Sequence, residues 1–222
     1  MNNIDFIYDK IGYKFKDAKL LDTALTHSSY ANENGVESYE RLEFLGDAVI
    51  EFIVSDYILK YEELAAGTLT RLRASLVSTE NLAKISTMLS IMQVVKKSRS
   101  LSTFSKKNTA DICESLIGAI YLDGGIIEAK KMIEKFIIIG DNHISDMLKS
   151  VVDYKTKFQE DMQHKGRSFE YKLLGSVGMD HNKTFECGLY INGELITKAY
   201  GKSIHMAEED CARKYYEINV GR

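Results

Sequence analysis

A helix with an acidic stripe constrains this sequence more than any other feature. Between Glu37 and Tyr57 the apolar residues recur with helical spacing, and at about 100° per residue four carboxylates fall within one narrow stripe. These acids are Glu40, Glu43, Asp47 and Glu51. The opposite side of the predicted helix carries Leu42, Leu45, Val49, Phe52 and Ile53. Like charges three or four residues apart oppose helix formation by roughly 0.2–0.5 kcal/mol per pair, so the stripe predicts a cation that the helix itself does not supply.

Two explanations of the acidic stripe compete. In the first, Ser38 caps the helix, and the helix dipole favours an anion at Glu40 and, in part, at Glu43. Asp47, however, lies well past the first turn, where the dipole no longer helps and where Asp is a mediocre helix former. A divalent metal ion held by oxygen ligands therefore accounts for the stripe better than capping does.

A second acidic pair lies on a segment that is otherwise apolar. Asp111 and Glu114 are three residues apart and point the same way. The next positions on their stripe, Ser115 and Gly118, are small and would let another helix or a ligand come close. Carboxylates on a buried helix are costly unless they are paired or hold a metal. Capping behind Asn108 or Thr109 is an alternative role for Asp111, but not for Glu114.

Composition and charge limit the class of protein. Lys and Arg number 29 against 32 Asp and Glu, so any phosphate-binding surface must be local. The basic run from Lys96 to Lys107 is either such a surface or a solvated loop. Arg71 and Arg73 either balance the carboxylates or bind phosphate, or they are an ordinary solvated pair. With no secretion signal and no apolar run of roughly 20 residues, the sequence predicts a cytoplasmic protein. Its 3 cysteines are widely spaced and predict buried thiols, not a zinc site.

The hydrophobic period changes near residue 150. Residues 1–149 show helical periodicity and predict an all-α domain. Residues 150–222 predict a helix, three antiparallel strands and a second helix, which together make a small α+β module. The Asn192-Gly193 pair predicts a type I′ turn between the last two strands.

Four motifs, in order along the chain, resemble the ribonuclease III family. ALTHSSY begins at Ala24, ERLEFLGDAV at Glu40, LTRLRASLV at Leu69 and DICESLIGAIYLD at Asp111, and ERLEFLGDAV is a highly specific signature. The C-terminal module, which begins DYKTKFQEDMQ at Asp153, is similar to the double-stranded RNA-binding domain of the bacterial enzymes. The resemblance implies a homodimeric endonuclease that uses Mg²⁺, or Mn²⁺ in its place, to cut duplex RNA. It would process ribosomal RNA precursors and other structured RNAs and leave 5′-phosphate and 3′-hydroxyl ends.

The same resemblance assigns roles to individual residues of the nuclease domain. The implied metal ligands are Glu43, Asp47, Asp111 and Glu114. Asp47 and Glu114 would lie closest to the chemistry, Glu40 would be a further acid near the cleavage site, and Phe44 would pack into the partner subunit. Phosphodiester hydrolysis needs an activated water and neutralised charge on the phosphate and the leaving oxygen, which carboxylate-held divalent ions can provide.

In the C-terminal module the resemblance implies an RNA-contacting surface. Its residues are Thr156, Gln159, Glu160, Gln163, His181, Lys202 and Ser203. The first four lie on the helix that reads the minor groove and its 2′-hydroxyls. The sequence departs from the family pattern where Ile204 and His205 replace two phosphate-contacting lysines, and Lys202 compensates only in part. We therefore predict weaker and less salt-sensitive RNA binding than is usual for this module.

Two other functions can be weighed against the nuclease. A catalytically silent protein on the same fold would bind duplex RNA, but binding of a polyanion gains nothing from a cluster of carboxylates. A di-iron helical protein would also place acids on facing helices. That class uses a Glu-x-x-His spacing, and no His follows any of these acids at the third position.

Overall fold

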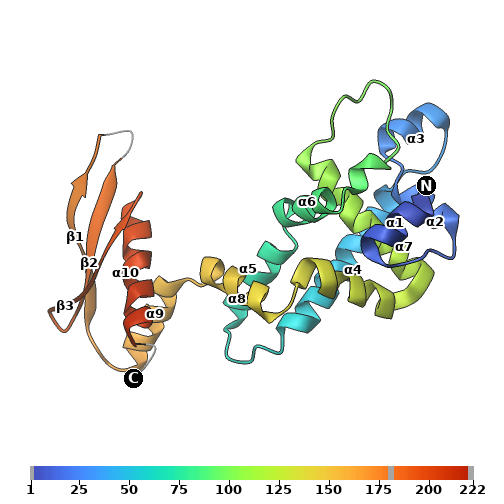
Figure 1. Ribbon diagram of the computed structural model, residues 1–222. Helices are drawn as coiled ribbons and strands as arrows, with labels where there is room; N and C mark the ends of the chain where they lie inside the picture. Colours follow the sequence, from blue (N-terminus) through green and yellow to red (C-terminus); the bar gives the residue numbers. More distant parts are fainter. Residues whose placement is uncertain (1–2, 180–182, 220–222) are drawn as a thin grey trace. The chain divides into compact units, whose positions relative to one another are not determined.

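The chain folds into two compact units, Met1–Val151 and Val152–Arg222. The structure is a computed structural model that describes residues 3–179 and 183–219 (Figure 1). The first unit contains α1 (Asn3–Ile11), α2 (Ala18–Ala24), α3 (Ser28–Asn34), α4 (Glu40–Ile58), α5 (Ala66–Leu76), α6 (Thr79–Met88), the 3₁₀ turn η1 (Ile91–Gln93), α7 (Lys106–Ile133), the π turn η2 (Glu134–Ile138) and α8 (Asp141–Val151). The second contains α9 (Tyr154–His164), β1 (Phe169–Val177), β2 (Thr184–Ile191), β3 (Glu194–Gly201) and α10 (Ile204–Asn219).

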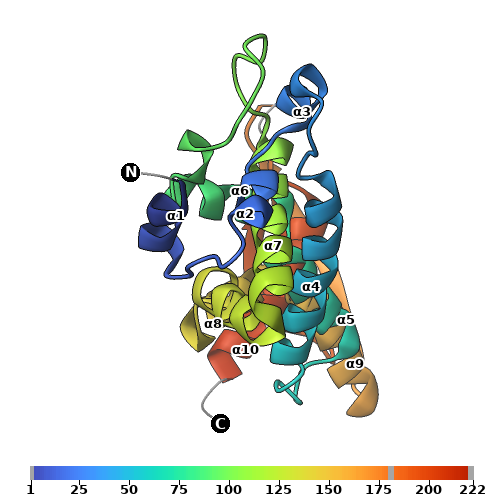
Figure 2. The ribbon, with the colours of Figure 1, turned by 90° about the vertical axis from the view of Figure 1, so that its right-hand side faces the viewer.

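The long helices α4 and α7 run side by side through the first unit (Figure 2). They touch backbone to backbone at two glycines. A Cβ added at Gly46 would lie 1.8 Å from the carbonyl oxygen of Glu114, and one at Gly118 would lie 2.2 Å from the carbonyl oxygen of Leu42. Because no side chain fits at either place, the two glycines determine how close the helices approach. They therefore determine how close the acids of the two helices lie.

The core of the first unit forms around this helix pair. Ile50 and Ile53 of α4 pack with Ile112 and Ile120 of α7, and all four are at most 1% exposed. Each fully buried side chain of this size contributes about 1.5–3 kcal/mol to stability relative to its exposed state. Helices α5 and α6 add Leu72, Leu76 and Leu82 to the same core. The pair is thus held rigidly from the side opposite its acidic residues.

The exposed side of α4 differs from the sequence prediction at Phe52. The prediction placed Phe52 on the apolar side that faces the core, but its side chain is 64% exposed. The buried face of α4 is centred near Gly46 and Ile50, because that is where α7 lies against it. Phe52 falls about 160° from Ile50 on a helix and therefore points to solvent. The acidic stripe consequently lies at the border between the buried and exposed faces.

The segment after Thr26 forms a short helix. Helix α3 covers Ser28–Asn34. His27 caps its first turn by accepting a hydrogen bond at Nδ1 from the backbone N–H of Ser29 (3.1 Å). Gly35 ends the helix with a left-handed backbone (φ 64°), a conformation that suits glycine. The caps at its two ends define this helix. Its residues show almost no apolar periodicity from which a helix could be predicted.

The second unit is a three-stranded antiparallel sheet, ordered β1-β2-β3, with α9 and α10 packed on one face (Figure 1). Its core joins Phe158 of α9, Leu189 of β2 and Cys211 of α10, all fully buried. Both Asn192 (φ 50°) and Gly193 (φ 86°) have positive φ, as the predicted type I′ turn requires. This order of elements confirms the predicted fold class. In the described ranges of both units, no helix has the length and apolar character needed to traverse a membrane.

Candidate active site

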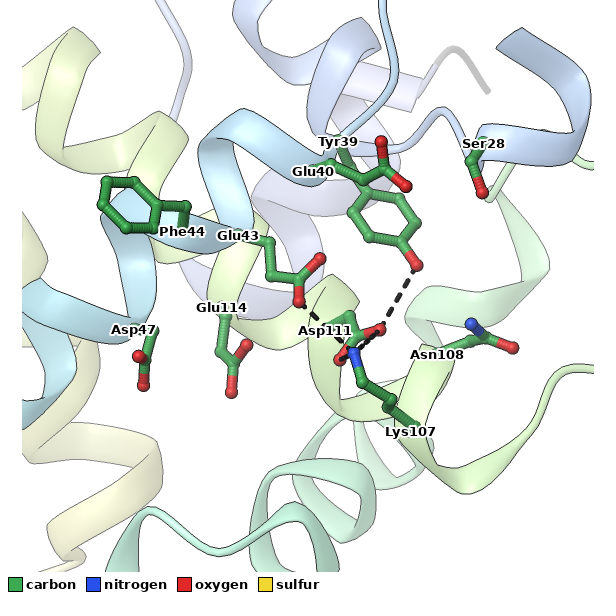
Figure 3. Close-up of a pocket in the computed structure, with 10 residues that line it drawn as sticks. All are labelled: Ser28, Tyr39, Glu40, Glu43, Phe44, Asp47, Lys107, Asn108, Asp111 and Glu114. Carbon is green, nitrogen blue, oxygen red and sulfur yellow. Dashed lines mark hydrogen bonds and ion pairs between the residues drawn. The ribbon is translucent and has the colours of Figure 1, made fainter. Parts of the chain in front are cut away.

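Acidic residues from α4 and α7 line one hollow of about 500 Å³ in the first unit (Figure 3). It is lined by Ser28, Tyr39, Glu40, Glu43, Phe44, Asp47, Lys107, Asn108, Asp111 and Glu114. The first helix supplies three carboxylates and the second supplies two. All five acids predicted to take part in catalysis or metal binding therefore line the same hollow.

Three carboxylates come closest together within this hollow. One oxygen from each of Glu43, Asp111 and Glu114 lies within 4.8 Å of the others. Asp47 is outside this group of three, although it lines the same hollow beside Glu114 (Figure 3). Glu40 lies further towards the rim, where it accepts a hydrogen bond from the Ser38 hydroxyl (3.1 Å). The three clustered oxygens are hard donors of the kind that bind Mg²⁺ or Mn²⁺.

The starts of α4 and α7 show that these acids are not caps. The capping box of α7 is formed by Ser105 and Asn108, so the alternative capping role for Asp111 is wrong. The residue before α4 is Tyr39, whose side chain makes no capping hydrogen bond, so Ser38 is not the cap of that helix. The side chain of Asp111 is only 8% exposed, and it lies beyond the first turn of α7. The helix dipole can therefore account for Glu40 and Glu43, which lie in the first turn of α4, but not for Asp47, Asp111 and Glu114.

The electrostatics of the hollow reflect its excess of negative charge. The pKa of Glu114 is raised to about 8, first by burial and then by the charges of Asp47, Asp111 and Glu43. Burial and Asp111 likewise raise the pKa of Glu43, although Lys107 acts in the opposite direction. An added cation would relieve both effects, because like charges in a partly buried site disfavour full ionisation.

Lys107 supplies a positive charge to the hollow, a position that the sequence did not predict for it. Its ammonium Nζ lies 3.0 and 3.1 Å from the two carboxylate oxygens of Asp111 and 3.4 Å from Oε1 of Glu43 (Figure 3). The sequence did carry one signal, since Lys107 and Asp111 are four residues apart on a helix. Its contact with Glu43 depends on the approach of α4 and could not be read from spacing.

The fourth acid of the predicted stripe does not join the hollow. Glu51 lies two turns beyond Glu43 on α4, and its Oε2 forms an ion pair with Nε of Arg73 (3.4 Å). Arg73 thus balances a carboxylate, which is one of the roles that the sequence suggested for it. The acidic stripe of α4 therefore has two parts. Glu51 is neutralised by Arg73, whereas Glu40, Glu43 and Asp47 line the hollow.

Four of the predicted RNA-contacting residues of the second unit share one exposed surface of α9. Thr156, Gln159, Glu160 and Gln163 are all exposed and fall on the side opposite the buried Phe158. At the start of α10, Lys202 is exposed and the Ser203 hydroxyl accepts a hydrogen bond from the backbone N–H of Met206 (3.2 Å). Ile204 is 41% exposed in the first turn of this helix. His181 lies outside the described residues.

The fold and the site together define a class of protein, a helical domain with a two-helix carboxylate site followed by an α-β-β-β-α module. A family model described as ribonuclease-III-like matches residues 17–140, and one described as a double-stranded RNA binding motif matches residues 154–218. Ribonuclease 3 of Listeria monocytogenes serotype 4a (strain HCC23) is 36% identical over 222 residues, which cover 96% of each chain. The chain belongs to the ribonuclease III family and is an endoribonuclease with a double-stranded RNA-binding domain.

Two solved structures support the same assignment. The nuclease domain of ribonuclease III from Campylobacter jejuni is 36% identical, with a TM-score of 0.57, and the match covers 62% of this chain and 95% of that one. A second structure of that domain is 35% identical with a TM-score of 0.56, covers 61% of this chain and 99% of its own, and concerns flexibility in a region involved in dimer formation. These comparisons confirm the family and the enzyme class predicted from the motifs.

Proposed function

We propose that the protein hydrolyses phosphodiester bonds of double-stranded RNA in a Mg²⁺-dependent reaction that leaves 5′-phosphate and 3′-hydroxyl ends. The observation that carries this proposal is the group of three carboxylates, contributed by two helices, whose oxygens lie within 4.8 Å of one another. An all-oxygen donor set of this kind fits Mg²⁺ and Mn²⁺. Sites that lack a nucleophilic side chain commonly use such ions for phosphate chemistry.

Each acid has a proposed role that follows from its position. Glu43, Asp111 and Glu114 would hold the metal, which when bound activates water and offsets charge on the phosphate. Asp47 faces the same hollow beside Glu114 and would complete the ligand set or orient the attacking water. Glu40, nearer the rim, would act as a further acid near the scissile strand.

Cleavage of a labelled RNA duplex tests this site directly. We expect cutting with Mg²⁺ or Mn²⁺, and we expect Glu114→Gln to lower the rate by about 10²–10³-fold, the size seen when one charge-stabilising group is removed from an active site. Duplex binding should survive this substitution. Glu51→Gln is the matched control, because Glu51 lies on the same helix but pairs with Arg73 outside the hollow. If the wild type binds the duplex but does not cleave it with any of the metal ions, the protein is a silent RNA-binding member of its family.

We also propose a homodimer built on the exposed face of α4. Phe44 is 81% exposed, and Phe52 and Leu59 lie on the same side of the helix. Beside Phe44 is a hollow of about 810 Å³ whose apolar lining includes Leu42 and Leu122. An exposed aromatic ring next to an apolar hollow is self-complementary under two-fold symmetry, since each subunit can supply the ring that fills the other's hollow. The Campylobacter jejuni nuclease domain, which has a region involved in dimer formation, is consistent with this arrangement.

Sedimentation of the full chain checks the dimer. We expect the wild type to be dimeric and Phe44→Asp to shift it to monomer, because a charge in a desolvated apolar contact is strongly unfavourable. Met88→Asp is the control, since Met88 is also exposed (63%) but lies on α6. A monomeric wild type, or a Phe44→Asp protein that stays dimeric, would refute this interface.

Structured RNAs are the proposed substrates, including ribosomal RNA precursors and messenger RNAs with duplex segments. We place the protein in the cytoplasm, where these RNAs are processed. The exposed polar surface of α9 suits recognition of the shallow minor groove of duplex RNA, which displays the 2′-hydroxyls. Incubation with a precursor RNA that carries a long stem tests this, and cuts confined to unpaired regions would contradict it.

A further inference from the structure

We propose that Lys107 is a built-in counterion that occupies part of the metal site and must be displaced when a divalent ion binds. This inference rests on the proposed function, since it takes Glu43, Asp111 and Glu114 as metal ligands. It adds a property of this chain's own side chain, which is a lowered affinity of the site for metal.

The ammonium lies where a metal ion would also be attracted. It contacts both carboxylate oxygens of Asp111 (3.0 and 3.1 Å) and one of Glu43 (3.4 Å), which are two of the three clustered acids (Figure 3). A divalent ion that used those oxygens could not share them with a lysine at hydrogen-bond distance, because the two cations would repel each other strongly. Binding of the metal and binding of the ammonium are therefore mutually exclusive at these oxygens.

The stability of α7 does not explain a cation at this position. Lys107 is the second residue of the helix, where the dipole disfavours positive charge. Its neighbour Lys106 is in the same unfavourable turn but points away from the hollow, to an ion pair with Glu80. Among the residues that the structure describes, the carboxylates of Asp111 and Glu43 are the groups that hold the ammonium of Lys107. That makes it a partner of the site and not a support of the helix.

The lysine can also leave without disturbing the fold. Its side chain is 71% exposed, whereas that of Asp111 is only 8% exposed. A long flexible arm anchored at the surface can swing into solvent by rotating its own bonds, while the buried carboxylate stays in place. The structure thus provides one fixed anion and one removable cation, which is what exchange of an ammonium for a metal requires.

Calorimetric titration of the metal-free full chain with Mg²⁺, and separately with Ca²⁺, tests the proposal without relying on cleavage. We expect Lys107→Gln to bind both metals about three- to tenfold more tightly than the wild type, the effect of removing a competing ion pair worth on the order of 1 kcal/mol. Lys107→Arg keeps the charge and should bind like the wild type. Lys106→Gln removes the neighbouring charge outside the hollow and should also leave affinity unchanged.

Thermal unfolding gives a second readout that separates a counterion from a structural residue. In EDTA, Lys107→Gln should unfold a few degrees below the wild type, because the acids lose their only cation among the described residues of the hollow. At saturating Mg²⁺ the two proteins should unfold at the same temperature. If Lys107 merely supported the fold, its substitution would lower the unfolding temperature both in EDTA and at saturating Mg²⁺.

The outcomes distinguish this inference from the proposed function. If Lys107→Gln binds metal with unchanged or weaker affinity while the wild type binds it saturably, the counterion role is refuted and the metal site stands. Tighter binding by Lys107→Arg would also refute it, since charge would then not be the cause. If the wild type shows no saturable binding of Mg²⁺ or Ca²⁺, the metal site and the counterion role both fail.

Discussion

Glu209 of the second unit and two acids of the hollow in the first unit, Asp47 and Glu114, have opposite kinds of neighbours. In the second unit, Glu209 accepts hydrogen bonds from the backbone N–H groups of Tyr154 (2.6 Å) and Lys155 (3.3 Å), and so joins α10 to the start of α9. In the first unit, no hydrogen-bond donor within the described residues reaches the carboxylates of Asp47 and Glu114. Burial raises the pKa of both Glu114 and Glu209, but only Glu209 has donors that offset it.

This difference separates a structural acid from the acids that we propose hold the metal or act beside it. A carboxylate that accepts backbone N–H bonds stabilises the fold, and its removal leaves those donors without a partner. A carboxylate placed among other carboxylates without a donor destabilises the metal-free fold. Such a group is retained because of what it binds. The comparison therefore predicts that substitutions of these acids change the free energy of unfolding of the metal-free protein in opposite directions in the two units.

The largest expected effect is on the helix contact that creates the acidic site. Gly118→Ala places a methyl group 2.2 Å from the carbonyl oxygen of Leu42, so α4 and α7 must separate. We expect a loss of about 3 kcal/mol or more in the free energy of unfolding, at the upper end for overpacking, together with loss of cleavage. Urea denaturation measures the stability change.

A glycine of the second unit provides the control for this substitution. A Cβ at Gly175 meets no atom within 4 Å. Gly175→Ala should therefore change stability by no more than about 0.5 kcal/mol. Equal effects of the two substitutions would mean that the backbone contact of α4 and α7 does not position the site.

The next effect compares one acid from each unit. Glu209→Ala should lower the free energy of unfolding by about 2 kcal/mol, because two backbone donors to a charged group are lost. Glu114→Gln, measured in EDTA at pH 8, should instead raise it, because a buried like charge is removed. Destabilisation by both substitutions would show that Glu114 is also a structural acid.

The pH dependence sharpens this contrast. The pKa of Glu114 is raised from its ordinary value of 4.5 to about 8, so the folded state holds a proton that the unfolded state has already released. Its contribution is therefore favourable below about pH 4.5 and is lost as the pH rises through 8. In EDTA, the stability difference between the wild type and Glu114→Gln should grow across this window. Saturating Mg²⁺ should abolish the trend, and its persistence would contradict the metal site.

The smallest expected effect concerns the phosphate contacts of the second unit. Restoring lysine at Ile204 and His205 should tighten duplex RNA binding. It should also steepen the dependence of log affinity on log salt concentration by up to about 0.9 for each new phosphate contact. Both residues are exposed in the first turn of α10, so the fold should tolerate the change. Salt titrations of the full chain measure the slope, and an unchanged slope would show that this turn does not face phosphate.

Local patterns in the sequence predict much of this fold. Helical periodicity identified α4 and its acids, and a two-residue turn motif identified the β2–β3 hairpin. The same reasoning failed where a feature depended on contacts between distant segments. The exposure of Phe52 follows from where α7 lies, and the contact of Lys107 with Glu43 joins residues 64 positions apart. Neither can be read from a helical wheel.

The assignment of acids within the site met the same limit. The stripe on α4 includes Glu43, Asp47 and Glu51, and spacing alone treats them as equivalent. The structure separates them, because Glu43 joins the acids of α7, Asp47 lies beside that group and Glu51 pairs with Arg73. Tertiary packing decides which carboxylates of one helical face share a cation.

The glycine contact between α4 and α7 should also make the proposed metal site selective for the size of the ion. Because backbone touches backbone at Gly46 and Gly118, the two sets of ligands stand at a separation that side-chain repacking cannot adjust. Ca²⁺ prefers oxygen ligands at about 2.3–2.6 Å and Mg²⁺ at about 2.0–2.1 Å. A larger ion would have to be accommodated by turning carboxylates and not by spreading the helices. We therefore expect Ca²⁺ to occupy the site with a distorted ligand shell, bound but poorly placed for chemistry.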